Sequence, residues 1–222
     1  MTVRGVVFDL DGTLVDSRQD IVAACQHMLH EHGRPELPPD EIAGFVGDGA
    51  RLLVARATRL RADEPALEPF LATYLAYYAA HGHERTGLLP GVESVLDALQ
   101  HLPLALCTYK PRATLDPLLE HLDLVSRFTV VVGAEDVPRH KPDPLPLQYI
   151  AERLATSASH LVMVGDGPQD VEAGRAAGAR TVGIPGCFLP RSRLVAACPD
   201  VLIEDITELP GTIARWDPHA IV

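Results

Sequence analysis

The chain has 222 residues, of which 47% are hydrophobic, and its formal net charge is −11. This length fits one large α/β domain or a core domain with a small insert, and the apolar content is too high for a disordered chain. The acidic charge argues against binding nucleic acid through a general basic surface, and no apolar stretch approaches the roughly 20 residues of a membrane-spanning helix.

The cellular compartment is indicated by the N-terminus and by the cysteines. A predicted strand begins within three residues of the N-terminus, so we expect no secretory signal and no membrane attachment. The four cysteines are far apart and show no C-x-x-C spacing. We therefore expect free thiols in a reducing cytoplasm.

Short apolar runs that alternate with helix-length segments predict a parallel sheet. Runs of this kind rich in β-forming residues, separated by helices, are typical of a doubly wound sheet covered on both faces. Ligands of such folds bind at the carboxyl ends of the strands. The predicted strands are residues 3–10, 104–107, 129–133, 161–164, 181–184 and 201–203, and the later predicted helices are 111–121, 144–154 and 168–177.

One interval, residues 16–86, breaks this alternation because it contains helical patterns and no convincing strand. Asp16 or Ser17 can cap a first helix, which Gly33 ends. Further helices are predicted near Asp40, at 50–61 and at 65–80. We therefore expect a small all-helical cap domain at 16–86, inserted after the first strand of a core formed by 1–15 and 87–222.

Two carboxylates follow the first strand, in the segment Asp9-Leu10-Asp11-Gly12-Thr13. The strand period of two points Asp9 and Asp11 to the same side, and Gly12 permits a sharp turn. Two like charges this close resist ionisation unless a cation intervenes, so a bound metal or one protonated carboxyl is expected. Either arrangement suits catalysis, although a strand end followed by an Asp-Gly turn has the same sequence.

The second predicted strand is followed by Thr108, Tyr109 and Lys110. A hydroxyl and backbone N–H groups at the junction of a strand and a helix can hold phosphate oxygens. Taken alone, this segment is better explained by Thr108 as an ordinary helix cap.

The lysines are sparse and therefore informative. Of 19 basic residues, only Lys110 and Lys141 are lysines. An ammonium is a compact point charge that the planar guanidinium of arginine does not reproduce, so both lysines are candidate site residues. Lys141 lies in a loop that two prolines stiffen, where it could neutralise a carboxylate pair and a phosphate.

Another pair of acids, Asp166 and Asp170, follows the buried run at 161–164. Carboxylate oxygens of this kind suit Mg²⁺, which takes one or two carboxylates together with waters and substrate oxygens. Asp170 could alternatively stabilise the N-terminus of the next helix.

Together, the four strand ends resemble the haloacid dehalogenase (HAD) superfamily over nearly the whole chain. The resemblance implies a Mg²⁺-dependent phosphatase in which the first Asp is the nucleophile and the second is the general acid/base. It implies that Thr108, Tyr109 and Lys141 bind the phosphoryl group. The Mg²⁺ ligands would be the side chains of Asp9 and Asp166 and the carbonyl of Asp11, with Asp170 close by. Family dehalogenases lack the acid at the position of Asp11, which favours phosphoryl transfer.

Within the superfamily, the chain is most similar to phosphoglycolate phosphatases and their relatives. The similarity is carried by the motifs at 44–50, 89–92, 141–144 and 171–178, of which the Gly47-x-Gly49 loop is the most specific. Two departures lie beside the implied phosphate and metal sites: Tyr109 replaces the common Asn, and Gly167 replaces the common Ser. The implied partner is a small phosphorylated metabolite, and the protein would be a monomer or a homodimer.

Other activities of the superfamily leave different signatures. A phosphonate hydrolase needs a Schiff-base lysine in the cap, and residues 16–86 contain no lysine. A sugar phosphomutase or a pyrophosphatase shares the core motifs, although Thr13 favours the hydrolases. A non-catalytic binding protein on the same scaffold would lack one of the catalytic positions, and a protein phosphatase would need a more open site.

Selectivity is expected to come from the insert, because the core motifs only bind phosphate. Gly47 and Gly49 would let the backbone approach a ligand closely, and Arg51 is the nearest cation that could pair with a carboxylate. The alternative is a simple turn between helices followed by a solvated Arg51. If Arg51 does pair with a carboxylate of the ligand, the substrate is expected to be a phosphorylated carboxylic acid such as 2-phosphoglycolate.

Overall fold

The computed structural model describes residues 2–220, and its central element is a six-stranded parallel sheet. The order of its strands is β5-β4-β1-β6-β7-β8, as expected for a doubly wound fold. Val7 of β1 pairs with Ala105 of β4 on one side and with Met163 of β6 on the other. The strands are β1 (Gly5–Phe8), β4 (Leu104–Cys107), β5 (Val130–Val132), β6 (Leu161–Gly165), β7 (Arg180–Gly183) and β8 (Val201–Leu202).

Helices cover both faces of the sheet because successive strand residues point to opposite sides. Val6 and Phe8 of β1 belong to a buried cluster with α5 (Val92–Ala98), α6 (Arg112–His121) and α10 (Leu209–Trp216). Val7 belongs to a second buried cluster with α7 (Leu145–Arg153) and α8 (Pro168–Ala177). The remaining helix of this part, α9 (Arg191–Ala197), packs against α8.

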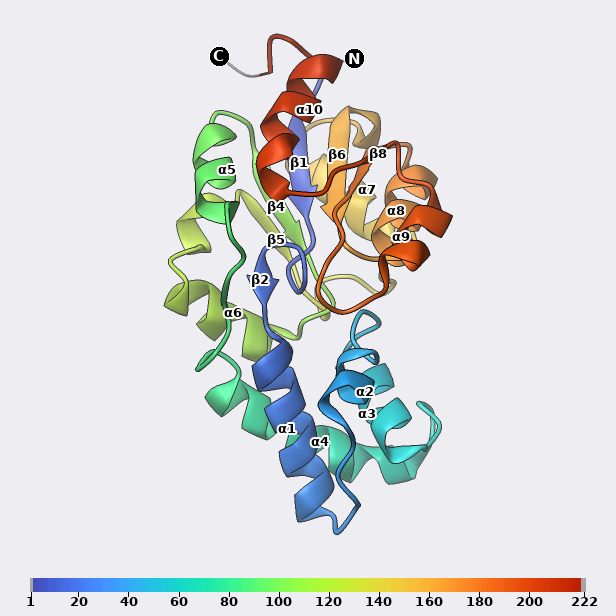
Figure 1. The fold of residues 1–222 in the computed structure, drawn as a ribbon. Coiled ribbons are helices and arrows are strands. Elements are labelled where there is room, and N and C mark those ends of the chain that lie inside the picture. Colours follow the sequence, from blue (N-terminus) through green and yellow to red (C-terminus); the bar gives the residue numbers. More distant parts are fainter. Residues whose placement is uncertain (1, 221–222) are drawn as a thin grey trace.

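The interval between the first strand and the rest of the sheet is helical, as predicted. It contains α1 (Arg18–Glu31), α2 (Pro39–Ala43), α3 (Ala50–Thr58) and α4 (Glu68–His81), which are called here the helical insert. These helices bury their own apolar residues, among them Met28, Val54 and Tyr74. Figure 1 shows the helical insert below the carboxyl ends of the strands, at the opposite end of the molecule from α10.

The edges of the insert differ from the prediction in two details. Asp16 lies in a two-residue strand, β2 (Val15–Asp16), which pairs antiparallel with β3 (Gly87–Leu88). Strands this short carry no sequence signal. Ser17 is the N-cap of α1 but makes no side-chain capping bond; Asp16 instead accepts a hydrogen bond from the backbone N–H of Arg18, at 3.1 Å.

A buried carboxylate ties the two ends of the insert together. Oδ2 of Asp20 in α1 accepts hydrogen bonds from the backbone N–H groups of Arg85 and Thr86 and from the Thr86 hydroxyl, at 2.7–3.0 Å. The segments that enter and leave the insert are therefore joined by side-chain bonds as well as by the β2–β3 pair.

The lengths of the helices and the state of the cysteines can be read from the structure. Within residues 2–220, no helix has the length and apolar character needed to cross a membrane. All four cysteines are free, and Cys198 is exposed.

Replacing Asp20 by Ala is expected to destabilise the protein, because the three donors lose a charged acceptor in a buried place. The expected loss in the free energy of unfolding is about 2–4 kcal/mol, measured by urea denaturation. Asp63 lies in the same insert and forms only an exposed pair with Arg61, so Asp63→Ala should leave the urea midpoint unchanged. Equal stability of the two variants would contradict the role given to Asp20.

Candidate active site

The sheet brings the acidic and hydroxyl residues of three strand ends side by side. Asp9 follows β1 directly, Thr108 follows β4, and Asp166 follows β6. Because β4 and β6 both pair with β1, these side chains meet at one edge of the sheet. Asp170 joins them from the first turn of α8.

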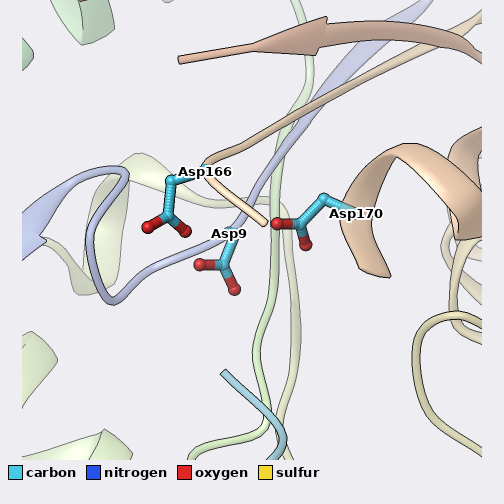
Figure 2. A group of neighbouring side chains, drawn as sticks. All are labelled: Asp9, Asp166 and Asp170. Carbon is cyan, nitrogen blue, oxygen red and sulfur yellow. The ribbon is translucent and has the colours of Figure 1, made fainter. Parts of the chain in front are cut away.

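Three of these carboxylates form a compact cluster. One oxygen from each of Asp9, Asp166 and Asp170 lies within 4.8 Å of the other two, and all three residues are buried. Figure 2 shows the side chains gathered between the end of β1, the end of β6 and the start of α8. The resemblance described above predicts that Asp9 and Asp166 are metal ligands and that Asp170 lies close to the metal.

Lys141 neutralises part of this cluster from a loop after β5. Its ammonium lies 2.7 Å from Asp9 Oδ1 and 2.6 Å from Asp170 Oδ1, and it donates to the carbonyl of Cys107 at 2.8 Å. Burial works against its charge, but Asp170 and Asp9 outweigh this effect and hold the pKa of Lys141 well above its usual value. The side chain is 1% exposed, so it is fixed rather than solvated.

The donor set fits a divalent cation. Burial raises the pKa of Asp9 to about 7; Lys141 opposes this rise, and the Asp170 and Asp11 carboxylates add to it. Burial likewise raises the pKa of Asp166 well above the usual range. When Asp9, Asp166 and Asp170 are all ionised, Lys141 balances only one of their three negative charges, and a net charge of −2 remains. Hard oxygen donors with this charge match the preference of Mg²⁺.

Room for Asp166 depends on two glycines. A Cβ at Gly12, whose φ is +88°, would collide with Oδ2 of Asp166, and so would a Cβ at Gly186. Gly12 was predicted to permit a turn, but its second function, making space for a carboxylate, is visible only in the structure. No sequence signal marked Gly186.

Asp11 lines the cavity and has two partners. Its Oδ1 accepts a hydrogen bond from the Ser17 hydroxyl at 2.5 Å and lies 3.2 Å from the ammonium of Lys110. Lys110 is buried and donates to the hydroxyl of Tyr78 in α4 at 2.7 Å. The Ser17 and Tyr78 contacts were not anticipated, since neither residue belongs to a motif with a fixed spacing to Asp11.

The remaining predicted core residues surround this cluster. The Thr108 hydroxyl accepts a hydrogen bond from the N–H of Lys110 at 3.2 Å. The Tyr109 hydroxyl donates to the carbonyl of Lys141, which braces the lysine loop. Thr13 is buried, and its hydroxyl has no hydrogen-bond partner within the part of the chain that the structure describes.

A cavity with about 690 Å³ of empty space, part of it open to solvent, lies between the sheet edge and the helical insert. Asp9, Asp11, Thr108 and Lys110 line it from the core. The insert contributes a largely apolar and aromatic wall. These wall residues are Ile21, Val46, Gly47, Gly49, Ala50, Leu53, Tyr74, Leu75 and Tyr78.

The loop at Gly47 and Gly49 contacts the core at Gln169 and Tyr109. The Gln169 side chain donates to the carbonyl of Gly47 at 3.2 Å. Gly49 has a φ of +89°, and a Cβ there would lie 3.3 Å from the ring of Tyr109. The aromatic ring that departs from the family pattern is therefore a surface on which the loop packs.

Arg51 is not brought to the site. Its guanidinium donates to both carboxylate oxygens of Glu68, at 2.8 and 3.2 Å, and to the carbonyl of Ala62. It is exposed and does not line the cavity. Helix α3 begins at Ala50, which faces the cavity, and one further residue along the helix turns Arg51 away.

Comparison with known proteins decides the family. The family model described as haloacid dehalogenase-like hydrolase matches residues 6–184. The chain belongs to the haloacid dehalogenase-like hydrolases. Among the relatives of this hydrolase is a phosphoglycolate phosphatase of Pseudomonas putida, 36% identical over 216 residues, covering 94% of this chain and 79% of the relative. A phosphoglycolate phosphatase of Escherichia coli K12 is 35% identical, covering 93% of this chain and 91% of the relative.

A solved structure shows the same fold as this hydrolase. The crystal structure of a predicted phosphoglycolate phosphatase from Haemophilus somnus 129PT superposes with a TM-score of 0.87 at 25% identity. The match covers 96% of this chain and 99% of that one, so it includes the helical insert as well as the sheet.

Two Gly→Ala variants of this hydrolase are expected to have opposite effects on stability, because Gly186 packs against Asp166 and Gly211 has open space around it. Gly186→Ala forces Asp166 to move, which should lower the free energy of unfolding by about 1–3 kcal/mol. A Cβ at Gly211 in α10 meets nothing within 4 Å. Gly211→Ala should therefore raise the free energy of unfolding by about 0.5–1 kcal/mol, by helix propensity. Urea denaturation compares the two, and a neutral Gly186→Ala would contradict the packing.

Proposed function

We propose that this hydrolase is a Mg²⁺-dependent phosphatase that acts on a small phosphate monoester of the 2-phosphoglycolate type through a phosphorylated Asp9. The observation that carries the proposal is the placement of two carboxylates with different partners at the end of β1. Asp9 is held by Lys141 inside the acidic cluster, whereas Asp11 faces the cavity beside Lys110. The names of the relatives support the substrate class.

In the first step, a carboxylate oxygen of Asp9 attacks phosphorus, and an O–P bond forms as the bond to the ester oxygen breaks. Asp11 gives its proton to the departing oxygen, which leaves as an alcohol. In the second step, Asp11 takes a proton from water, and the water oxygen bonds to phosphorus as the bond between the Asp9 oxygen and phosphorus breaks. Inorganic phosphate is released and Asp9 is regenerated, so Asp11 acts first as acid and then as base.

The phosphoryl group would be held by Thr108, the loop at Tyr109 and Lys141. Thr108 lines the cavity at the end of β4, where a helix begins shortly afterwards. Lys141 is bonded to Asp9 and thus lies where charge develops on the phosphoryl oxygens. Tyr109 supports Lys141 through its hydroxyl rather than through a charge.

Mg²⁺ would be held by the side chains of Asp9 and Asp166 and by the carbonyl of Asp11, with Asp170 nearby. When bound, it supplies positive charge for the phosphoryl oxygens. Asp170 accepts from Lys141 through one oxygen and from the N–H of Gly167 through the other. It therefore positions the lysine and the loop that carries Asp166.

We further propose that residues 16–86 act as a cap domain over a core formed by 1–15 and 87–222. The chain passes from the core into the cap and back again, and the β2–β3 pair and the Asp20 bonds join these two connecting segments. The loop at Gly47 and Gly49 covers the cavity, so opening of the cap would admit substrate and closure would exclude water.

Asp9→Asn should abolish turnover while leaving the fold intact, because the amide keeps the shape of the side chain but is a poor nucleophile. We expect kcat to fall by on the order of 1,000-fold or more, measured by phosphate release from 2-phosphoglycolate. Asp97 forms an exposed pair with Arg127 and serves as the matched control. Asp97→Asn should retain normal kcat, and near-normal kcat in Asp9→Asn would rule out the mechanism.

Removal of divalent cations should stop the reaction reversibly. After chelation and gel filtration we expect no measurable phosphate release, and addition of Mg²⁺ should restore it, whereas Na⁺ at equal ionic strength should not. Full activity of the chelated protein would contradict the proposed role of the acidic cluster.

A further inference from the structure

We propose that Lys110, held by Tyr78 of the helical insert, is the residue that recognises a carboxylate on the leaving group of the substrate. This inference rests on the proposed phosphatase function and assigns the role that the sequence had given to Arg51.

The charges around the cavity single out Lys110. Among the described residues that line it, Lys110 is the only lysine or arginine, and the acidic lining residues are Asp9, Asp11 and Asp166. Lys141 lies deeper, bonded to Asp9 and Asp170. A substrate with a second anionic group would therefore find one cation in the cavity outside the phosphate site.

The position of Lys110 relative to Asp11 places it beside the leaving group. Asp11 must reach the ester oxygen to protonate it, and the ammonium of Lys110 lies 3.2 Å from Asp11 Oδ1. In 2-phosphoglycolate one methylene separates the ester oxygen from the carboxylate. When Asp11 contacts the ester oxygen, the carboxylate of the substrate is only two carbon atoms away from that oxygen. A cation next to Asp11 therefore lies near the carboxylate.

Tyr78 fixes this cation from the insert. Its hydroxyl accepts from the Lys110 ammonium at 2.7 Å, and the ammonium lies 4.5 Å from the centre of the Tyr78 ring. An ammonium carries three N–H donors; Tyr78 accepts one of them and Asp11 is an ion-pair partner at 3.2 Å, so at least one donor remains for a ligand. Because Lys110 is only 6% exposed, its charge is poorly screened by water.

The rest of the wall favours a short substrate. Leu53, Tyr74 and Phe188 offer no charge to a longer polar leaving group. A carboxylate bonded to Lys110 would fill the polar part of the cavity, and the apolar side chains would exclude water from the ion pair.

The test compares two esters whose leaving groups are both alkoxides: 2-phosphoglycolate and 2-hydroxyethyl phosphate, which has an uncharged hydroxymethyl group in place of the carboxylate. Lys110→Met keeps the apolar stem and removes the charge. Loss of the cation beside Asp11 affects both esters, so the readout is selectivity: we expect the ratio of kcat/KM on 2-phosphoglycolate to kcat/KM on 2-hydroxyethyl phosphate to fall by about 10- to 100-fold. Tyr78→Phe should show the same selectivity with a smaller loss. Arg61→Ala, an exposed change in the insert, should alter neither ester.

Several results would overturn the inference. An equal loss on both esters would mean that Lys110 only positions Asp11, and no loss on either would remove it from the site. If Lys110→Met fails to fold, the same comparison of kcat/KM on the two esters is made with Tyr78→Phe, and an equal loss on both or no loss on either would overturn the inference. Wild-type protein that hydrolyses 2-hydroxyethyl phosphate as well as 2-phosphoglycolate would refute carboxylate recognition but leave the phosphatase standing. Wild-type protein that releases phosphate from neither ester would refute both.

Discussion

The structure depends on the burial of several negative charges at one end of the sheet and on their partial neutralisation by the buried ammonium of Lys141. Asp9, Asp166 and Asp170 are packed together where water is largely excluded, and Lys141 contacts two of them. Isolated carboxylates in such a place would take up protons. The loop that presents Lys141 is braced by Tyr109, and the loop that carries Asp166 by Asp170. Much of the local architecture therefore serves to hold charges at fixed positions.

The second organising feature is the division of tasks between the sheet edge and the helical insert. The core supplies the charged groups, and the insert supplies an apolar wall and the Tyr78 hydroxyl, which reaches the core through Lys110. Asp20 and the β2–β3 pair join the two connecting segments at the base of the insert. The Gly47–Gly49 loop touches the core at the opposite side of the cavity. Contacts at both sides fix the position of the wall over the carboxylates.

Part of this site is readable from residue order. Asp9, Thr108, Lys141 and Asp166 each follow a recognisable apolar strand, and parallel strands end at one edge, so their meeting could be predicted. The rarity of lysine also singled out Lys141 and Lys110, and both lie beside carboxylates of this cluster or next to it. By contrast, Gly186, Ser17 and Tyr78 carry no local pattern, because their importance comes from neighbours distant in the chain.

The sequence alone determined the α/β class, the position of the helical interval and the carboxylates that gather at the strand ends. These follow from periodicity and from the direction of parallel strands, which are properties of short segments. Only the tertiary structure decided which cation faces the cavity. Arg51 is one residue from a lining position but turns with the helix toward Glu68, whereas Lys110 is held between Asp11 and Tyr78. That choice depends on how α3 and α4 pack against the core, and no local sequence pattern records such packing.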